Sequence, residues 1–324
     1  MARPFDAVLV ISFGGPQGLA DIRPFLANVL RGRRVAPERV EEVAHHYELF
    51  GGVSPITELT RRQAAGLAER LRRDGPDLPV FVGMRNWHPY LADTLSEMAA
   101  QGLRRAIGVV TAAQRSYSSC LQYKENVADA RADVRRRGRP DVEVTYVGDW
   151  HAHEGFVAAN AAHVADAVGR LPENLRGRAR LVFTAHSIPT QMADAYPYVA
   201  QLREGAAMVA ARAGFGEWAL VYQSRSGRPQ DPWLEPDICN YLRAEQARGL
   251  DAIVVSPIGF VCDHVEVLYD LDTKAAAVAK ELGIAMTRAK TACDHPLFLD
   301  ALADMVRRTW TRYSRGRPLP IVSQ

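Results

Sequence analysis

A histidine stands where an apolar run ends and a turn begins. The run is LVFTA at 181–185, and His186 follows it directly. A second apolar run, IVVS at 253–256, leads through a short Pro-Ile-Gly loop to Glu266. Open parallel sheets bind their ligands beyond the carboxyl ends of the strands. His186 and Glu266 are therefore the first residues expected to do chemistry in this chain.

The residues after Glu266 indicate a metal path. Asp270 lies four residues after Glu266, and Lys274 lies four further, a spacing that stacks side chains on one face of an α-helix. A neutral imidazole and a carboxylate suit a first-row divalent metal. Two protein ligands make an open site that passes a metal on. The alternative is that these charges lie exposed along one helix face and that His186 is only a hydrogen-bonded histidine at a strand end.

Composition and charge narrow the class of protein. The chain has 324 residues, of which 48% are hydrophobic and 24% charged, and its net charge of +3 is too small to predict a nucleic-acid partner. It has no apolar run of about 20 residues and no signal-peptide layout, so we expect no transmembrane segment and a cytoplasmic location. Four widely spaced cysteines predict neither a disulfide framework nor a zinc site.

The elements that must position these residues alternate between strands and helices. Eight runs predict strands, several of them apolar without alternation, as in parallel strands covered on both faces. These runs are 7–12, 80–84, 106–111, 142–147, 181–185, 219–223, 252–256 and 284–287. Amphipathic stretches predict helices at 57–73, 91–101, 118–136, 155–169, 197–213 and 265–282. This order predicts βαβ units and parallel sheets.

The eight strands divide evenly around residue 150. We therefore predict two similar α/β domains, 1–150 and 151–295, with a cleft between them. The last helix, 296–313, is expected to pack back on the first domain, and 314–324 to form a tail.

Aromatic residues near the strand ends suit a planar ligand. Trp233 lies in a proline-rich loop after the sixth strand, while Tyr47, Phe50 and Tyr123 follow other loops. A large flat apolar ligand binds against such a wall, with a few polar groups at its edge. The glycines after the first strand do not form a Gly-x-Gly-x-x-Gly motif, so a dinucleotide is disfavoured. They allow a flat ligand near the backbone, although a simple tight turn explains them equally well.

Taken in order, these segments resemble the ferrochelatase family over nearly the whole chain, to about residue 310. The matching motifs are SFGGP (12–16), YELFGGVSPI (47–56), GMRNW (83–87), AHSIP (185–189), QSRSG (223–227), DPWL (231–234) and PIGFVCDHVEVLYD (257–270). The resemblance implies a chelatase-like fold of two Rossmann-like domains, each with a four-stranded parallel sheet flanked by helices. It implies a lyase of haem biosynthesis that inserts ferrous iron, a substrate, into a porphyrin and requires no resident cofactor.

The resemblance also implies roles for particular residues. His186 and Glu266 would face each other across the macrocycle as the catalytic and metal-binding pair, with Asp270 as an outer step of the path. Two pyrrole protons must leave, and a base that titrates near neutral pH suits their removal. We hypothesise that His186 accepts protons while Glu266 delivers metal or relays protons. Whether His186 also holds the iron stays open at this point.

The coproporphyrin-using branch, in its actinobacterial form, is the most similar part of the family. Ser54 and Tyr123 match positions that contact the porphyrin there, and the chain lacks the longer membrane-facing lip of animal-type enzymes. These features favour coproporphyrin III, with four carboxylates, over protoporphyrin IX. Arg31, Arg33 and Arg34 are the predicted partners of those carboxylates.

Three departures from the family pattern carry expectations. Phe13 stands where some members have an iron-ligating tyrosine, so it can only stack on the porphyrin. Lys274 replaces an acid and puts an outer divalent-metal site in doubt. Cys120 resembles one ligand of a [2Fe–2S] cluster, but the C-terminal cysteine triplet is missing, and a cluster needs four ligands. We therefore predict no cluster.

Several alternatives remain at this point. The chain could use protoporphyrin IX, insert cobalt or nickel instead of iron, or carry a tetrapyrrole without catalysis. The partners expected are the porphyrin and ferrous iron, with transient contact to neighbouring haem-pathway enzymes.

Overall fold

The computed structural model describes residues 3–32, 35–228 and 230–316, and contains two parallel four-stranded sheets. Their strand orders are β2-β1-β3-β4 and β6-β5-β7-β8, so the second sheet repeats the order of the first. The strands are β1 (Ala7–Ser12), β2 (Val80–Met84), β3 (Arg105–Val110), β4 (Glu143–Tyr146), β5 (Arg180–His186), β6 (Trp218–Gln223), β7 (Ala252–Ser256) and β8 (Ala285–Arg288). The predicted α/β class with two parallel four-stranded sheets is confirmed.

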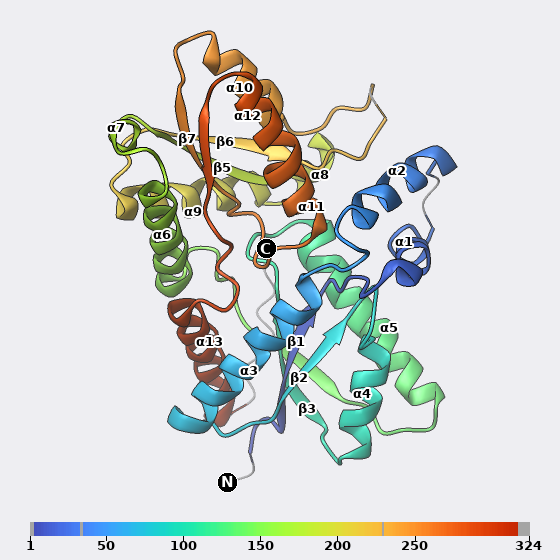
Figure 1. Cartoon of the computed structure of the whole chain (residues 1–324). Coiled ribbons are helices and arrows are strands. Elements are labelled where there is room, and N and C mark those ends of the chain that lie inside the picture. Colours follow the sequence, from blue (N-terminus) through green and yellow to red (C-terminus); the bar gives the residue numbers. More distant parts are fainter. Residues whose placement is uncertain (1–2, 33–34, 229, 317–324) are drawn as a thin grey trace.

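Helices flank both sheets (Figure 1). Around the first sheet lie η1 (Leu19–Asp21), α1 (Ile22–Val29), α2 (Pro37–Glu48), α3 (Ile56–Asp74), α4 (Leu91–Ala100), η2 (Tyr117–Leu121) and α5 (Gln122–Arg136). Around the second lie α6 (Glu154–Gly169), α7 (Glu173–Arg176), α8 (Thr190–Ala195), α9 (Tyr198–Ala213), α10 (Ile238–Gln246), α11 (Val265–Val267), η3 (Leu268–Ala275) and α12 (Ala276–Glu281). The chain then forms α13 (Pro296–Ser314). The domain division at residue 150 stays a prediction.

The apolar strands are buried because helices cover both of their faces. All six residues of β1 are buried, and its side chains alternate between two hydrophobic clusters. Val8 and Val10 point to the cluster that contains Leu67 of α3, while Leu9 and Ile11 point to the cluster on the other face. Successive side chains of a strand point to opposite faces, so an unalternating apolar run fits only a two-sided core.

The last helix, α13, links the two halves. It packs against α3 of the first half and α6 of the second, and Figure 1 shows it beside both. Phe298 of α13 lies in one hydrophobic cluster with Phe156 of α6, Leu67 of α3 and Phe183 of β5. The two sheets therefore share one core, and the loops at their strand ends are held at a fixed separation.

Each sheet reverses its strand order beside its first strand. β1 lies between β2 and β3, and β5 lies between β6 and β7. Ligands of open parallel sheets bind at such switch points, beyond the carboxyl ends of the strands. The loops after β1 and β3 and those after β5 and β7 are therefore the segments of the fold that can form a site.

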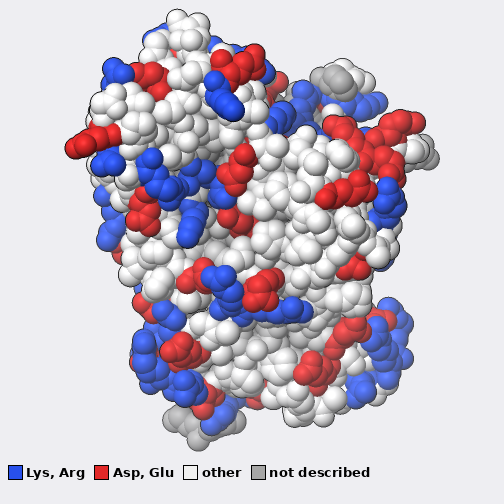
Figure 2. Space-filling model, in the orientation of Figure 1, with Lys and Arg blue, Asp and Glu red and all other residues white. Residues whose placement is uncertain are grey.

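The surface carries both signs of charge. On the face shown in Figure 2, acidic and basic side chains are interspersed, with an uncharged area between them, and neither sign dominates. This distribution agrees with the small net charge of +3. No helix of the described ranges is both long and apolar enough to cross a membrane.

The contact between α6 and α13 gives a first prediction. A Cβ atom on Gly155 would lie 2.5 Å from the carbonyl oxygen of Leu297 and 2.8 Å from Cβ of Ala301. We expect Gly155→Ala to lower the free energy of unfolding by about 1–3 kcal/mol, since the two helices must move apart. Denaturant unfolding measures this change.

Gly169→Ala is the matched control, because Gly169 ends the same helix and a Cβ there meets nothing within 4 Å. This control should be neutral or stabilising by up to about 1 kcal/mol. Equal stabilities of the two variants would contradict the close packing of α6 on α13.

Candidate functional site

His186 is the last residue of β5, and hydrogen bonds fix its orientation. The hydroxyl of Tyr198 donates to the His186 carbonyl at 3.0 Å, and the ring atom Nδ1 lies 2.5 Å from the carbonyl oxygen of Ser187. A carbonyl oxygen only accepts hydrogen bonds, so Nδ1 carries the proton in the neutral ring. The lone pair is then on Nε2, where it is available to a proton or a metal ion.

Glu266 lies on α11 with its carboxylate directed at His186. Oε2 of Glu266 is 3.7 Å from Nε2 of His186, and the two side chains are 38% and 33% exposed. Nitrogen and oxygen ligands at about 2.1 Å from one ion lie at most about 4.2 Å apart, so an ion fits between these atoms at a wide angle. In the described ranges no three His, Cys, Asp or Glu side chains group closely enough to hold a metal ion. Two ligands leave the remaining coordination positions open.

His264 is a member of this group that the sequence analysis did not select. Its Nε2 also lies 3.7 Å from Oε2 of Glu266. Burial lowers the pKa of the His264 imidazole below its usual range, with the Glu266 charge opposing the shift. The ring is therefore neutral at neutral pH. The His-x-Glu spacing of His264 and Glu266 was the signal that could have identified it.

The loop that carries these residues rests directly on the end of β5. The backbone N–H of Gly259 donates to the carbonyl of Thr184 at 3.0 Å. A Cβ atom on Gly259 would lie 2.5 Å from Cβ of Ala185, so only glycine allows this approach. The contact places the loop after β7 against the residue that precedes His186.

Arg288 of β8 holds the segment around Glu266 from both sides. Its guanidinium donates to both oxygens of Asp263, at 3.1 and 3.2 Å, and to both oxygens of Asp272, at 2.7 and 2.8 Å. Bidentate arginine–carboxylate pairs restrict orientation as well as distance. The loop before Glu266 and the helix after it are therefore tied to the same strand.

The helix after Glu266 differs from the prediction. The predicted α-helix is π-helical over η3, Leu268–Ala275, while the stacking of Glu266, Asp270 and Lys274 on one face stays a prediction. A π-helix bonds residues five apart and is rare, but it occurs often at functional sites. Together with burial, the Glu266 charge acts on Asp270, raising the pKa of its carboxyl.

Asp270 occupies a largely buried position beside the loop after β6. The hydroxyl of Ser224 donates a hydrogen bond to its Oδ2. Burial raises the pKa of the Asp270 carboxyl, Ser224 opposes this, and the Glu266 charge raises it further. Asp270 is therefore easier to protonate than an exposed aspartate.

The hairpin of α1 and α2, from the first half, covers the Glu266 segment. Val265 packs in one cluster with residues of this hairpin, and the ring of His46 stacks on Tyr269 at 3.6 Å. Tyr47 is buried in α2 rather than exposed as a wall. Burial raises the pKa of its hydroxyl well above the usual value, and the Glu266 charge raises it further, so it stays neutral.

Two residues predicted to contact porphyrin meet in the first half through an arginine. The guanidinium carbon of Arg85 lies 5.5 Å from the ring centre of Phe13 and 5.0 Å from that of Tyr123. Phe13 is half-buried after β1, and Tyr123 is buried in α5. Ser54 is also buried, and its Cβ lies 2.5 Å from where a Cβ on Gly15 would be. Arg85 was missed, although it stands in the GMRNW segment.

No interaction among the described residues links the remaining predicted porphyrin-binding residues to Phe13, Tyr123 and Arg85. Arg31 is exposed and donates to Oδ1 of Asn28 at 2.7 Å. Trp233 is half-buried beside Gly227 and pairs through its backbone with Pro189, three residues after His186. Arg33 and Arg34 lie outside the described residues.

The four cysteines are free thiols in three different places. Cys262 and Cys293 are buried with their sulfur atoms 2.8 Å apart, whereas Cys120 lies in η2 and Cys239 in α10. The expected absence of a [2Fe–2S] cluster stays a prediction.

Solved structures define the class of this fold. The chain is similar to SirB from Bacillus subtilis, solved with Fe3+, with a TM-score of 0.57 at 13% identity over 96% of this chain and 98% of that one. It is equally similar to the sirohydrochlorin chelatase SirB from Bacillus subtilis subspecies spizizenii in complex with cobalt, with a TM-score of 0.56 at 12% identity, covering 96% and 98% of the two chains. At such identity the likeness shows the fold alone, which is the chelatase-like fold.

Sequence comparison gives the family within that class. The family model Ferrochelatase matches residues 5–310. A ferrochelatase from Rhodopirellula baltica is 47% identical, covering 94% of this chain and 86% of that protein. A coproporphyrin III ferrochelatase from Streptomyces griseus is 48% identical, covering 94% and 85%. The chain belongs to the ferrochelatase family, enzymes of the lyase class that act in haem biosynthesis.

The buried carboxyl of Asp270 gives a prediction about pH. Its pKa is raised by folding, so this group stabilises the protein below its ordinary pKa and the benefit is lost as the pH rises through the raised value. We expect Asp270→Asn to melt at a higher temperature than the wild type at pH 7, and the difference to shrink toward pH 4. Thermal unfolding at both pH values measures it.

Asp129→Asn is the control, because Asp129 is exposed on α5. It should change the melting temperature little at either pH. A variant at Asp270 that loses more stability at pH 7 than at pH 4 would contradict the assigned direction.

Proposed function

We propose that this enzyme inserts Fe2+ into coproporphyrin III to give coproheme. The observation that carries the proposal is the pair of His186 Nε2 and Glu266 Oε2, 3.7 Å apart at the switch point of the second sheet. The pair sets a nitrogen with a free lone pair opposite a carboxylate. It lies where the α1–α2 hairpin of the first half packs on the second half. Family membership supports an enzyme over a tetrapyrrole carrier.

The proposed sequence of events starts with the metal. Fe2+ exchanges part of its water for Glu266 and Nε2 of His186, which leaves positions open for the pyrrole nitrogens. As iron enters the ring, the two N–H groups lose their protons. The iron leaves Nε2 of His186 as it enters the ring, and the freed Nε2 accepts one proton, since a base near neutral pH is matched to that transfer. The second passes to Glu266 and then to Asp270, whose raised pKa favours accepting it.

The porphyrin is proposed to bind against the strand ends of the first half. Phe13 and the Arg85 guanidinium supply an aromatic and cationic wall, the buried ring of Tyr123 supports Arg85, and Ser54 lies on the adjacent loop. Trp233 would contact the opposite edge from the second half, while the exposed Arg31 would pair with a porphyrin carboxylate. Walls on both sides of the ring would hold it bent toward the insertion geometry.

The choice of porphyrin is supported by the relatives. The protein from Streptomyces griseus and a second one from Streptomyces coelicolor, 46% identical, are both named coproporphyrin III ferrochelatase. A four-carboxylate substrate also suits the cationic side chains of Arg31 and Arg85. Cytoplasmic location, transient contact with other haem-pathway enzymes and the absence of a resident cofactor stay predictions from the sequence.

His186→Ala tests the proposed acceptor. We expect ferrous insertion under anaerobic conditions to slow by at least about 100-fold, because the base in the transition state is lost. Porphyrin binding, followed by fluorescence quenching, should stay within about threefold of the wild type. Absorbance of the metallated product measures the rate.

His45→Ala is the matched control, because the His45 side chain is 66% exposed on α2 and its Nδ1 lies 3.5 Å from Oε2 of Glu48. It should insert iron at the wild-type rate. Near-normal insertion by His186→Ala would remove His186 from the chemistry.

A substrate comparison tests the rest of the proposal. We expect kcat/KM for coproporphyrin III to exceed that for protoporphyrin IX by about tenfold or more, since each extra charge-assisted hydrogen bond contributes roughly 1.5–3 kcal/mol. The assay uses Fe2+ without oxygen, with Co2+ and Ni2+ in parallel reactions. Equal or better use of protoporphyrin IX would overturn the substrate assignment, and faster insertion of Co2+ or Ni2+ would overturn the choice of iron.

A further inference from the structure

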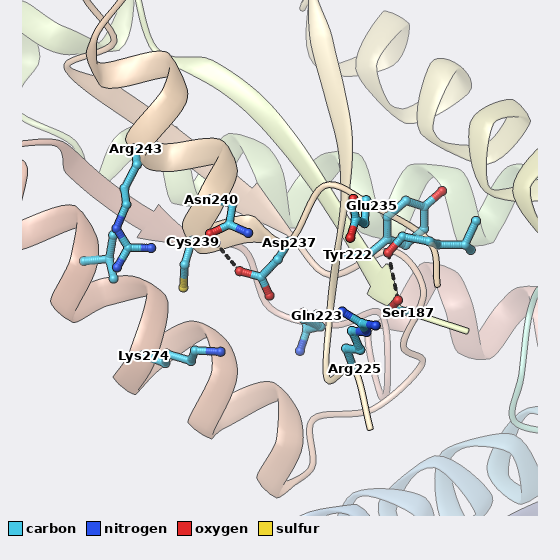
Figure 3. A pocket seen from close by; sticks show the side chains of 12 residues that line it. Ser187, Tyr222, Gln223, Arg225, Glu235, Asp237, Cys239, Asn240, Arg243 and Lys274 are labelled. Carbon is cyan, nitrogen blue, oxygen red and sulfur yellow. Dashed lines mark hydrogen bonds between the residues drawn. The ribbon is translucent and has the colours of Figure 1, made fainter. Parts of the chain in front are cut away.

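A cavity of about 410 Å³ lies beside the iron path and plays no part in the proposed insertion. Figure 3 shows it between the end of β6, the first turns of α10, and the helix formed by η3 and α12. Its polar lining includes Gln223, Lys274, Arg243, Asn240, Asp237 and Glu235. Three observations together indicate that it is a binding site.

The first observation is the side chain of Gln223. This residue is only 1% exposed, yet neither its amide oxygen nor its amide nitrogen has a hydrogen-bond partner. The amide nitrogens of two other buried glutamines do have partners, since Gln63 donates to the Cys293 carbonyl at 3.0 Å and Gln114 to the Ile258 carbonyl at 3.3 Å, although the Gln63 amide oxygen is also unpaired. A buried amide without partners is costly to the fold. Gln223 lines the cavity, so a ligand oxygen there can accept a hydrogen bond from its amide nitrogen.

The second observation is a pair of cations that line the cavity from two helices. Neither Lys274 nor Arg243 takes part in an ion pair or hydrogen bond among the described residues. Neighbouring arginines behave differently, since Arg180 and Arg248 both pair with Glu245. In Figure 3 the Lys274 ammonium extends toward the same space as the Gln223 amide, and Arg243 reaches across from α10.

The third observation is the acidic side of the cavity. Asp237 begins α10, and its Oδ1 accepts a hydrogen bond from the Cys239 N–H at 2.8 Å. Its other oxygen and the exposed Glu235 are acceptors at the cavity wall. A ligand that fits must therefore present anionic oxygens to the cations and a hydrogen-bond donor to the acids. A simple oxyanion without a donor matches only half of this lining.

We propose that this cavity binds a small hydroxycarboxylate. Its carboxylates pair with Lys274 and Arg243, its hydroxyl donates to the acidic wall, and the amide nitrogen of Gln223 donates to a carboxylate oxygen. Lys274 replaces an acid that could have formed part of an outer metal site. A lysine at this position favours binding of an anion instead of a cation.

The cavity adjoins the proposed iron path. Gln223 pairs in register with His186, and the next residue, Ser224, donates to Asp270. Lys274 lies one turn beyond Asp270 on η3, and the two charges interact. An anion held at this place lies next to Asp270, the proposed acceptor of the second proton. Binding does not require insertion, so the two proposals can fail separately.

Isothermal titration of citrate into the full-length, metal-free protein tests the proposal, with inorganic phosphate as the comparison. We expect saturable binding at one site and tighter binding of citrate than of phosphate. Replacing both cations, by Lys274→Gln with Arg243→Gln, should weaken citrate binding by about 100-fold, from roughly tenfold for each charge-assisted pair. Gln223→Leu should weaken it by about tenfold on the same basis.

Lys280→Gln is the matched control, because Lys280 is exposed on α12 and does not line the cavity. It should bind citrate like the wild type, and thermal unfolding verifies that every variant is folded. A concentration of about 10 mM citrate suffices to detect contacts of this strength. Absence of citrate binding to the wild-type protein at that concentration would overturn the proposal. It is equally overturned by phosphate binding as tightly as citrate, or by unchanged citrate binding in the variant without the two cations.

Discussion

The contact between Gly259 and the end of β5 is the constraint on which the site depends. The loop after β7 can reach His186 only because its backbone lies directly on Thr184 and Ala185, with the Gly259 N–H bonded to the Thr184 carbonyl at 3.0 Å. A methyl group at this position would push the loop away. The separation between His186 Nε2 and Glu266 Oε2 therefore follows from backbone packing, and not from the flexibility of two side chains.

The other contacts hold this arrangement from different directions. Arg288 ties the segments on either side of Glu266 to β8, and the α1–α2 hairpin packs over α11 from the first half. Both sheets have the same strand order. The switch point of each sheet therefore supplies one set of residues to the site. The first contributes the aromatic wall with Arg85, and the second contributes the histidine and the carboxylate. A flat ring with a metal entering from one side requires such a division between wall and reactive groups.

The sequence predicted the parts of this arrangement that depend on local pattern. Unalternating apolar runs identified the strands to within a residue or two, and His186 and Glu266 followed from their position after such runs. Resemblance to a family was needed to select Phe13 and Tyr123 as porphyrin contacts, because nothing in their spacing indicates that they lie near one another. Arg85 was missed, since it binds the two rings through contacts between elements far apart in the chain.

Other features were hidden for physical reasons. The π-helical turn at Leu268–Ala275 has no periodicity that distinguishes it from an α-helix in a single sequence. Tyr47 was expected near a loop, but it is buried on α2, because a helix was not recognised there. His264 has the residue type and spacing of a ligand, yet its closeness to Glu266 depends on the extended backbone before α11. Patterns indicate which residues can act, and packing decides which of them meet.

The central claim is that His186 and Glu266 act as one unit during insertion, and a double-mutant cycle tests it most directly. Single-turnover rates of anaerobic ferrous insertion into coproporphyrin III are measured for the wild type, His186→Ala, Glu266→Gln and the double variant. The account predicts that each single change costs about 100-fold and that the double variant is scarcely slower than either, because groups that act together are not additive. Losses that multiply to about 10⁴-fold would show independent roles and contradict the account.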